Sequence, residues 1–394
     1  MTRGTGLRWL LWQAVFVHAA LAVVRPMISY RALDLGASNT QIGLIATAWG
    51  VLPLLLAFAV GRRADAWGSG RLLVAGGVLS VSGSVTAMLA PGLGVLFAAA
   101  SALGLAHLLL MVGQQSAVAA AGSQEERDRG FGALTSASSV GQLLGPTVVL
   151  SLAGWLAADT DTGSVAVVGL AMAAGLSLVA APLGLGCALT RRPAERSGPR
   201  ATPRQAVSQL MRTDGMWRAL LTSGTVMAAI DVLMSFLPVW AEERGVSVAV
   251  VGWLLGVRAV VTVVVRLAVP RLIATFTRRW TFVGSLTSGV VGLAMLPFVD
   301  VPGAIVAMLL LGLGLGLSQP LTLSWVATLA PPEMRGAAVG LRLSANRLAQ
   351  TVVPATIAVA AAGSGTSGVF VGSAALMAAA TTTVLRREPR RDGA

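Results

Sequence analysis

Apolar runs of about 20 residues recur along the whole chain, and they restrict its fold more than any other feature. A helix needs roughly 20 apolar residues to cross the ~30 Å hydrocarbon core of a bilayer. The composition agrees, because 55% of the residues are hydrophobic and 11% are charged, far from the balance of a soluble domain. The sequence therefore predicts an all-α membrane protein with no room for a separate soluble domain.

We predict twelve membrane-spanning helices, with boundaries uncertain by a few residues. The predicted spans are Trp9 to Ile28, Gln41 to Val60, Leu72 to Ala90, Leu93 to Val118, Phe131 to Trp155, Val165 to Thr190, Ala219 to Trp240, Val248 to Val269, Trp280 to Val299, Ala304 to Trp325, Ala337 to Ala361 and Gly368 to Leu385. The first span follows a basic start as a signal peptide does, but its apolar stretch is too long for a signal core, so we predict a helix.

The positions of the basic residues predict the orientation. The chain contains no lysine, so its 29 basic residues are all arginine. Arg31 and Arg244 fall in predicted external loops, and Arg25, Arg258 and Arg347 fall within spans. The remaining arginines lie in or beside segments that a cytoplasmic N-terminus places in the cytoplasm, where positive loops stay. Both termini are thus predicted to be cytoplasmic, and topology explains the net charge of +13 without a nucleic-acid partner.

The chain divides into two related halves. We predict a six-helix bundle over residues 1–189, a basic cytoplasmic linker over 190–218, and a second bundle with a short basic tail over 219–394. The linker fits either a disordered segment or a short surface helix capped by Thr202, with Pro203 in its first turn and Val207, Leu210 and Met211 on one face.

An internal repeat supports this division. At one constant offset, Ser116 aligns with Ser324, Arg127 with Arg335, Gln142 with Gln350, and Pro146 with Pro354. Six spans return the chain to the same side, so the two copies have the same orientation. Parallel six-helix repeats of this kind build transporters whose substrate site lies near the midplane.

Two segments resemble the major facilitator superfamily, most closely its drug/proton antiporter branch. In the loop GRRADAWGSGR, Gly61, Asp65 and Gly68 match the family's signature between the second and third helices, and Arg71 is its nearest remaining cation. In GQLLGPTVVL, Gly141, Gly145 and Pro146 match the antiporter signature of the fifth helix. The resemblance implies alternating access and export. Ala66 replaces an arginine of the first signature, and the family's arginine in the fourth helix is missing.

The fifth-helix segment also has a physical interpretation. Gly141 and Gly145 lie one turn apart, so a neighbouring helix can approach their backbone closely. Pro146 removes a backbone donor and bends the helix near Gln142. We interpret this segment as a pivot for the transport cycle. Ordinary packing of small residues in a membrane bundle is the alternative.

The predicted substrate cavity is defined by polar residues at mid-depth. An ionisable group there is costly, so it is a functional candidate. His18, His107, Asp231 and Gln319 lie near the bilayer centre on the first, fourth, seventh and tenth spans. The resemblance implies that these four helices line the cavity. Neutral histidines packed within the bundle are the alternative for His18 and His107.

Three further residues complete the predicted site. Asp231 lies at nearly the same depth as Arg258, so an ion pair between them is possible, and opening of the pair would let Asp231 take up a proton. A purely structural pair is the alternative. Arg347 shares a face of the eleventh span with Gln350 and has no acidic partner at its depth in the sequence, so it is a candidate for binding an anionic substrate.

Other classes of function find no support in the sequence. One cysteine excludes disulfides within the chain and thiolate metal clusters, and no nucleophile–base constellation indicates an enzyme. We therefore expect no metal, no cofactor and no catalytic residue. The prediction is a monomeric plasma-membrane transporter that exports small amphiphilic molecules against protons. An organic-anion transporter, possibly an importer, held by Arg347 and Arg258 is the main rival, and a receptor on a transporter scaffold is a more distant one.

Overall fold

The structure consists of helices joined by short turns. The computed structural model describes residues 3–119, 124–159, 164–190, 203–331, 334–361 and 363–385, and these residues contain no β-strand. Within them, ten helical segments are long and apolar enough to cross a membrane. This agrees with the prediction of an all-α membrane protein with many spans.

The helices follow one another along the chain without intervening domains. Their bounds are α1 (Arg3–Asp34), α2 (Asn39–Trp67), α3 (Ser69–Met88), α4 (Leu93–Ala119), α5 (Gln124–Leu144), the π-helical turn η1 (Gly145–Leu150), α6 (Ser151–Asp159), α7 (Val165–Thr190), α8 (Pro203–Met211), α9 (Met216–Glu242), α10 (Val248–Met295), the 3-10 turn η2 (Leu296–Phe298), α11 (Val301–Leu329), α12 (Arg335–Ala360) and α13 (Gly365–Leu385).

Two regions account for the difference between the ten candidate membrane helices of the structure and the twelve spans predicted from the sequence. α10 covers both the eighth and the ninth predicted span, and its helical backbone is interrupted at Thr277, where φ is 63° and ψ is 156°. α12 coincides with the eleventh predicted span, but Arg335, Arg342 and Arg347 lower its hydropathy. The number of membrane crossings therefore stays a prediction.

The predicted loop between the second and third spans is mostly helical. α2 continues to Trp67, and α3 begins at Ser69. Gly68 alone joins them, with φ at 77°, a conformation that glycine adopts without the steric cost of a side chain. The short connection fixes the direction in which α3 leaves α2.

The chain forms two compact units, and two helices belong to both. Unit 1 comprises Met1–Gly198 and Met234–Ala259, and unit 2 comprises Pro199–Leu233 and Val260–Ala394. The boundaries at Leu233 and Ala259 fall inside α9 and α10. The division of the sequence at residues 190–218 into two six-helix bundles stays a prediction beside this observed division.

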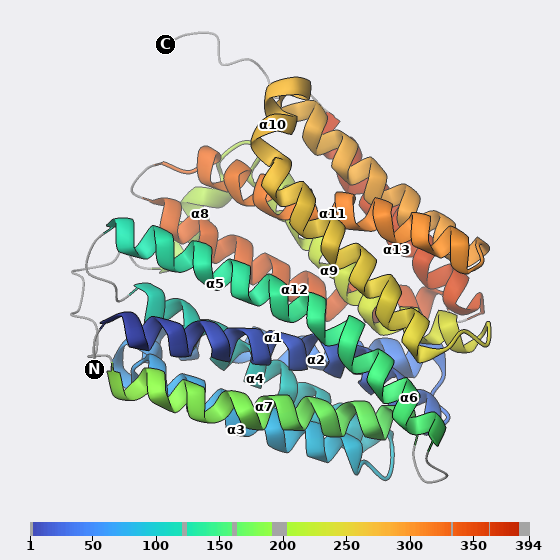
Figure 1. Ribbon diagram of the computed structural model, residues 1–394. Coiled ribbons are helices and arrows are strands. Elements are labelled where there is room, and N and C mark those ends of the chain that lie inside the picture. Colours follow the sequence, from blue (N-terminus) through green and yellow to red (C-terminus); the bar gives the residue numbers. More distant parts are fainter. Residues whose placement is uncertain are drawn as a thin grey trace. The chain divides into compact units, whose positions relative to one another are not determined.

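In unit 1, α1 has extensive contacts with α7 and α5, and α3 lies between α4 and α7 (Figure 1). Small residues on these helices permit the close packing. Much of the core is apolar, and it includes the fully buried Leu10, Met27, Leu103 and Leu110. Burial of such side chains among neighbouring helices orients each helix about its own axis.

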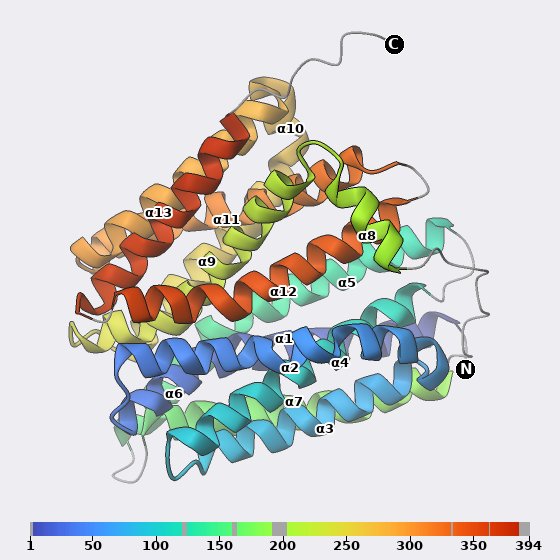
Figure 2. The same cartoon turned by 180° about the vertical axis from the view of Figure 1, so that it is seen from behind.

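In unit 2, α8 packs on α12, as Figure 2 shows. Leu210 of α8 is fully buried in an apolar cluster with Met216, Ala219 and Ala338. Val207 and Met211 remain exposed, with 40% and 46% of their surface accessible. The predicted short helix after the linker is therefore present, although Leu210 alone of the three predicted side chains packs in this cluster. Thr202, its predicted cap, lies outside the described residues.

The fifth-helix motif widens the helix and brings it against α1. The π-helical turn η1 begins at Gly145, with Pro146 in its first turn. A Cβ added at Gly145 would lie 2.5 Å from the carbonyl oxygen of Ala19, and one added at Gly141 would meet the carbonyl oxygen of Val15. Both glycines therefore face the backbone of α1. The predicted close approach is confirmed, and the predicted bend takes the form of a π-helical turn.

We predict that Gly145→Ala destabilises the protein, because the new methyl group forces α1 and η1 apart. Overpacking of this kind costs about 1–3 kcal/mol of unfolding free energy. Gly175→Ala on α7 is the control, since nothing lies within 4 Å of a Cβ there. Thermal unfolding in detergent measures both. Equal melting temperatures for the two variants would contradict the close contact.

Candidate functional site

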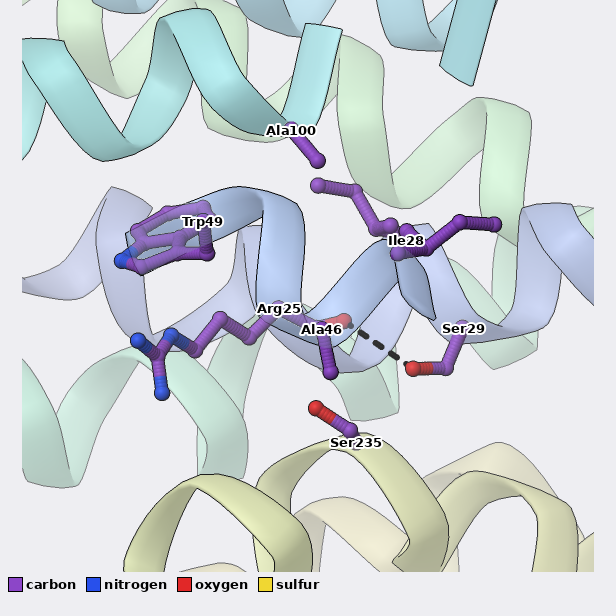
Figure 3. A pocket seen from close by; sticks show the side chains of 8 residues that line it. Arg25, Ile28, Ser29, Ala46, Trp49, Ala100 and Ser235 are labelled. Atoms are coloured by element: carbon purple, nitrogen blue, oxygen red, sulfur yellow. Dashed lines mark hydrogen bonds between the residues drawn. The ribbon is translucent and has the colours of Figure 1, made fainter. Parts of the chain in front are cut away.

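Unit 1 contains a small cavity among α1, α2, α4 and the part of α9 that follows Met234 (Figure 3). About 280 Å³ of space without protein atoms lies among its lining residues, and this figure includes space that is open to solvent. Its lining combines apolar and polar side chains, namely Arg25, Ile28, Ser29, Ile45, Ala46, Trp49, Ala100 and Ser235. Apolar walls with a few polar groups are typical of small-molecule sites.

Trp49 of α2 is the centre of this lining. The guanidinium carbon of Arg25 lies 4.7 Å from the centroid of the Trp49 ring, close enough for a cation–π interaction. The His107 ring of α4 meets the Trp49 ring edge-on, with centroids 6.2 Å apart and an interplanar angle of 62°. The indole therefore links a cation of α1 to an imidazole of α4.

Gly104 lets α4 approach α2 at Trp49. A Cβ added at Gly104 would meet the backbone carbonyl of Trp49. A larger residue would push α2 away, so glycine fixes the position from which the indole projects. Of the described α4 residues, Ala100 lines the cavity, whereas His107 and Gly104 contact Trp49.

His18 belongs to a separate buried chain of hydrogen bonds. Its Nε2 lies 3.3 Å from Oε1 of Gln114, and Nε2 of Gln114 donates to Oε1 of Gln13 at 2.9 Å. All three side chains are buried. Because an amide oxygen can only accept, Nε2 of His18 carries a hydrogen in this arrangement. His18 joins α1 to α4 and does not line the cavity.

Unit 2 gathers polar side chains from four helices around Gln319 of α11. Oε1 of Gln319 accepts from Nη2 of Arg266 at 3.2 Å, and its Nε2 lies 3.3 Å from Sδ of Met227. Arg266 also donates through Nε to the carbonyl of Gly316 at 3.3 Å. Nη2 of Arg342 donates to the Gln319 carbonyl at 3.2 Å and to Oγ1 of Thr322 at 3.0 Å.

Arg347 and Gln350 contact each other along α12. Nη1 of Arg347 lies 3.4 Å from Oε1 of Gln350, which is buried. Asp231 and Arg258 are both buried, with 4% and 8% of their surfaces accessible. Asp231 lies in unit 2 and Arg258 in unit 1, so the predicted ion pair would join different units and stays a prediction.

The first signature is described in part. Gly61 and Asp65 lie in the last turns of α2, but the Asp65 side chain is outside the described part of the chain. Gly68 makes the turn between α2 and α3, and Arg71 is exposed in the first turn of α3. Among the described residues, no group of three or more metal-binding side chains gathers.

The sequence interpretation missed four residues of these clusters. Trp49, Arg266 and Arg342 were not predicted as site residues, and neither was Gln13. Arg266 was placed near the end of a span at Val269, whereas the helix continues to the interruption at Thr277. The sequence signal that could have identified Arg266 is an arginine within an otherwise apolar helix. Arg25, which falls within the first predicted span, contacts Trp49.

Comparison with known proteins identifies the fold and the family. The model of the Major Facilitator Superfamily matches residues 10–243 and 219–394. No curated protein matches the chain significantly.

Three of the similar solved structures are transporters. The nucleoside transporter NupG has a TM-score of 0.76 at 14% identity, covering 97% of this chain and 100% of that one. The peptide transporter POT in complex with sulfate has 0.75 at 15%, covering 96% and 93%. A bacterial homolog of the human lysosomal transporter Spinster has 0.68 at 14%, covering 98% and 96%. These likenesses show the fold, and the family match shows that the chain belongs to the Major Facilitator Superfamily.

Proposed function

We propose that this chain is a monomeric secondary transporter of the plasma membrane that exports small amphiphilic organic molecules. In this proposal twelve helices form two parallel six-helix repeats with both termini in the cytoplasm, and the substrate site alternates between the two membrane faces. Family membership supports transport. The direction rests on the fifth-helix signature at Gly141, Gly145 and Pro146.

The cavity around Trp49 carries the proposal for the substrate. An indole ring and the side chains of Ile28 and Ile45 accept an apolar or aromatic body. Arg25, Ser29 and Ser235 accept polar groups beside it. A molecule with both characters matches this lining better than a purely polar or purely apolar one.

Protons are the proposed driving ion, and Asp231 is the proposed site of their binding. Its carboxyl group is buried on a helix that the family match covers. A buried carboxylate within a membrane span is costly, so exchange of its charge for a proton is a means of coupling. Uptake of one proton by Asp231 on the outer side and its release inside would exchange for one outward-moving substrate.

The rival function is transport of an organic anion, possibly inward, on Arg258 and Arg347. The Arg347 guanidinium contacts the neutral side chain of Gln350, and this contact does not distinguish between the two functions. Both functions predict flux, but they differ in the direction of transport, in the dependence on Asp231 and in the dependence on Arg347.

The decisive assay uses inverted membrane vesicles with an imposed proton gradient. We expect proton release when an amphiphilic substrate is added, and we expect Asp231→Asn to abolish it because an amide does not exchange a proton at this position. Glu243→Gln, an exposed change near the end of α9, should leave proton release intact.

Substrates in that assay are lipophilic cations, neutral drugs and organic anions. Proton release that persists in Asp231→Asn would reject coupling at this residue. Arg347-dependent anion accumulation without proton release would establish the rival function.

Replacement of Trp49 tests the cavity separately. We predict that Trp49→Leu raises the KM for an aromatic substrate roughly 5- to 30-fold, because the cation–π contact and the stacking surface are worth about 1–2 kcal/mol. Trp253→Leu on α10 is the matched control, since Trp253 is 63% exposed. Equal KM values for both variants would exclude Trp49 from the substrate site.

A labelling experiment tests the twelve crossings where hydropathy is weakest. If α12 crosses the membrane, cysteines placed at Pro331 and Ser364 should react with impermeant reagents from opposite faces in a Cys187→Ser background. These exposed residues lie just outside the two ends of α12. Labelling of both from one face would reject the twelve-helix arrangement.

A further inference from the structure

We propose that Arg266 and Arg342 of unit 2 form a binding site for the carboxylate group of the transported substrate. The site lies at Gln319, which both arginines contact. This inference rests on the proposed transport function and adds the charge of the substrate to it. Neither arginine belongs to the anion site predicted from the sequence.

The two guanidinium groups carry positive charge without a neutralising carboxylate. Their acceptors are the carbonyls of Gly316 and Gln319, the Gln319 amide and the Thr322 hydroxyl. All of these are neutral. Within the described part of the chain, no acidic side chain pairs with Arg266 or Arg342. Two positive charges therefore converge on one glutamine.

Most of the donor capacity of the pair is unused. Each guanidinium has about five N–H donors, so the two together have roughly ten. The structure gives them four hydrogen bonds. Nε of Arg342 is buried and has no hydrogen-bond partner, and the residue as a whole is only 7% exposed. A buried charged donor without an acceptor indicates that another molecule supplies one.

A second unsatisfied atom lies on the same face of α12. Oδ1 of Asn346, one turn after Arg342, is also buried without a partner. Nε of Arg342 can donate to a carboxylate, whereas Oδ1 of Asn346 can only accept and needs a donor elsewhere on a polar ligand. Asn346 itself is 5% exposed, so its amide faces the bundle rather than lipid.

The position within the membrane fits a substrate site. Successive membrane helices run in opposite directions, so alternate helix ends lie on the same side of the membrane. At 1.5 Å per residue, the four cluster residues lie roughly 10–16 Å from the helix ends on one such side; they are Met227, Arg266, Gln319 and Arg342. In the proposed twelve-helix arrangement the cluster lies within the hydrocarbon depth, where uncompensated charge is expensive. Charge that a protein keeps at such a depth marks a path for substrates or ions.

The geometry of the donors selects the chemical class. A guanidinium offers a planar fork of N–H groups that matches a carboxylate better than a halide or a neutral amide. Two forks on different helices, α10 and α12, can hold the two oxygens of one carboxylate. The inferred substrate is therefore an amphiphile with an apolar or aromatic body and a carboxylate.

The test measures binding by thermal unfolding of the purified full-length protein in detergent. The probes are 2-naphthoate and 2-naphthamide, which share a ring system and differ in charge, with ionic strength matched by sodium chloride. Size-exclusion chromatography of heated samples gives the Tm. We expect naphthoate at saturating concentration to raise the wild-type Tm by on the order of 2–4 °C, and naphthamide to leave it unchanged.

The variants assign the effect to the two arginines. Arg266→Gln and Arg342→Gln should each lose the naphthoate-dependent increase. Arg271→Gln is the matched control, because it removes the same charge from an exposed position of α10 and should keep the increase. If Arg342→Gln gives no monodisperse protein, Arg342→Lys replaces it. Lysine keeps the charge but loses the fork, so the increase should fall by more than half.

The outcomes separate this inference from the proposed function. No naphthoate effect in the wild type, or an effect retained in both glutamine variants, would overturn the carboxylate site. Loss of the effect in Arg271→Gln as well would also overturn it, since general charge would then be responsible. Because binding is measured without flux, a failed proton-release assay leaves this result standing and rejects only the transport proposal.

Discussion

The hydrocarbon core of a bilayer provides no water to hydrogen-bond backbone N–H and C=O groups, so each chain segment there has to satisfy these groups itself. The described helices meet this requirement along most of their length, and the departures occur where something compensates. At the widened turn η1, Pro146 removes a donor from the helical ladder. Hydroxyl groups in and after this turn donate to backbone carbonyls, from Thr147 to Leu143 at 2.6 Å and from Ser151 to Thr147 at 2.7 Å.

The same constraint governs the arginines, and the two units meet it differently. In unit 1, Arg25 lies over the face of Trp49, which offers a negative quadrupole without a formal charge. In unit 2, Arg266 and Arg342 bond to carbonyls, an amide and a hydroxyl. Both arrangements offset part of the cost of removing a guanidinium group from water.

Much of the fold could be predicted from the sequence because span length is a one-dimensional property. The apolar runs predict the helices, and the spacing of Gly141, Gly145 and Pro146 predicts close packing at the fifth of them. Helical periodicity near Pro203 predicts α8. These features depend on residues that are near one another in the chain, and so the sequence alone contains them.

The composition of the candidate site was less predictable, because it depends on which helix faces which. Residue counting gives the depth of a side chain but not its neighbour across the bundle. His18 and His107 were predicted at one depth, yet His18 bonds to Gln114 and His107 packs on Trp49. Trp49 lies within α2, and the sequence alone does not give the rings and cations that its indole meets. The helix of the eighth predicted span begins at Val248 as predicted but continues past Val269, because the helical backbone is interrupted only at Thr277.

The continuity of α9 and α10 across the unit boundaries has an elastic consequence. Residues on either side of Leu233 and of Ala259 belong to different units but to the same helices. No loop is present at either of these two boundaries. A reorientation of one unit against the other would therefore bend or twist α9 and α10. Asp231 and Arg258 lie within a turn of those points. Any change in the local backbone there alters the stiffness of the connection between the units.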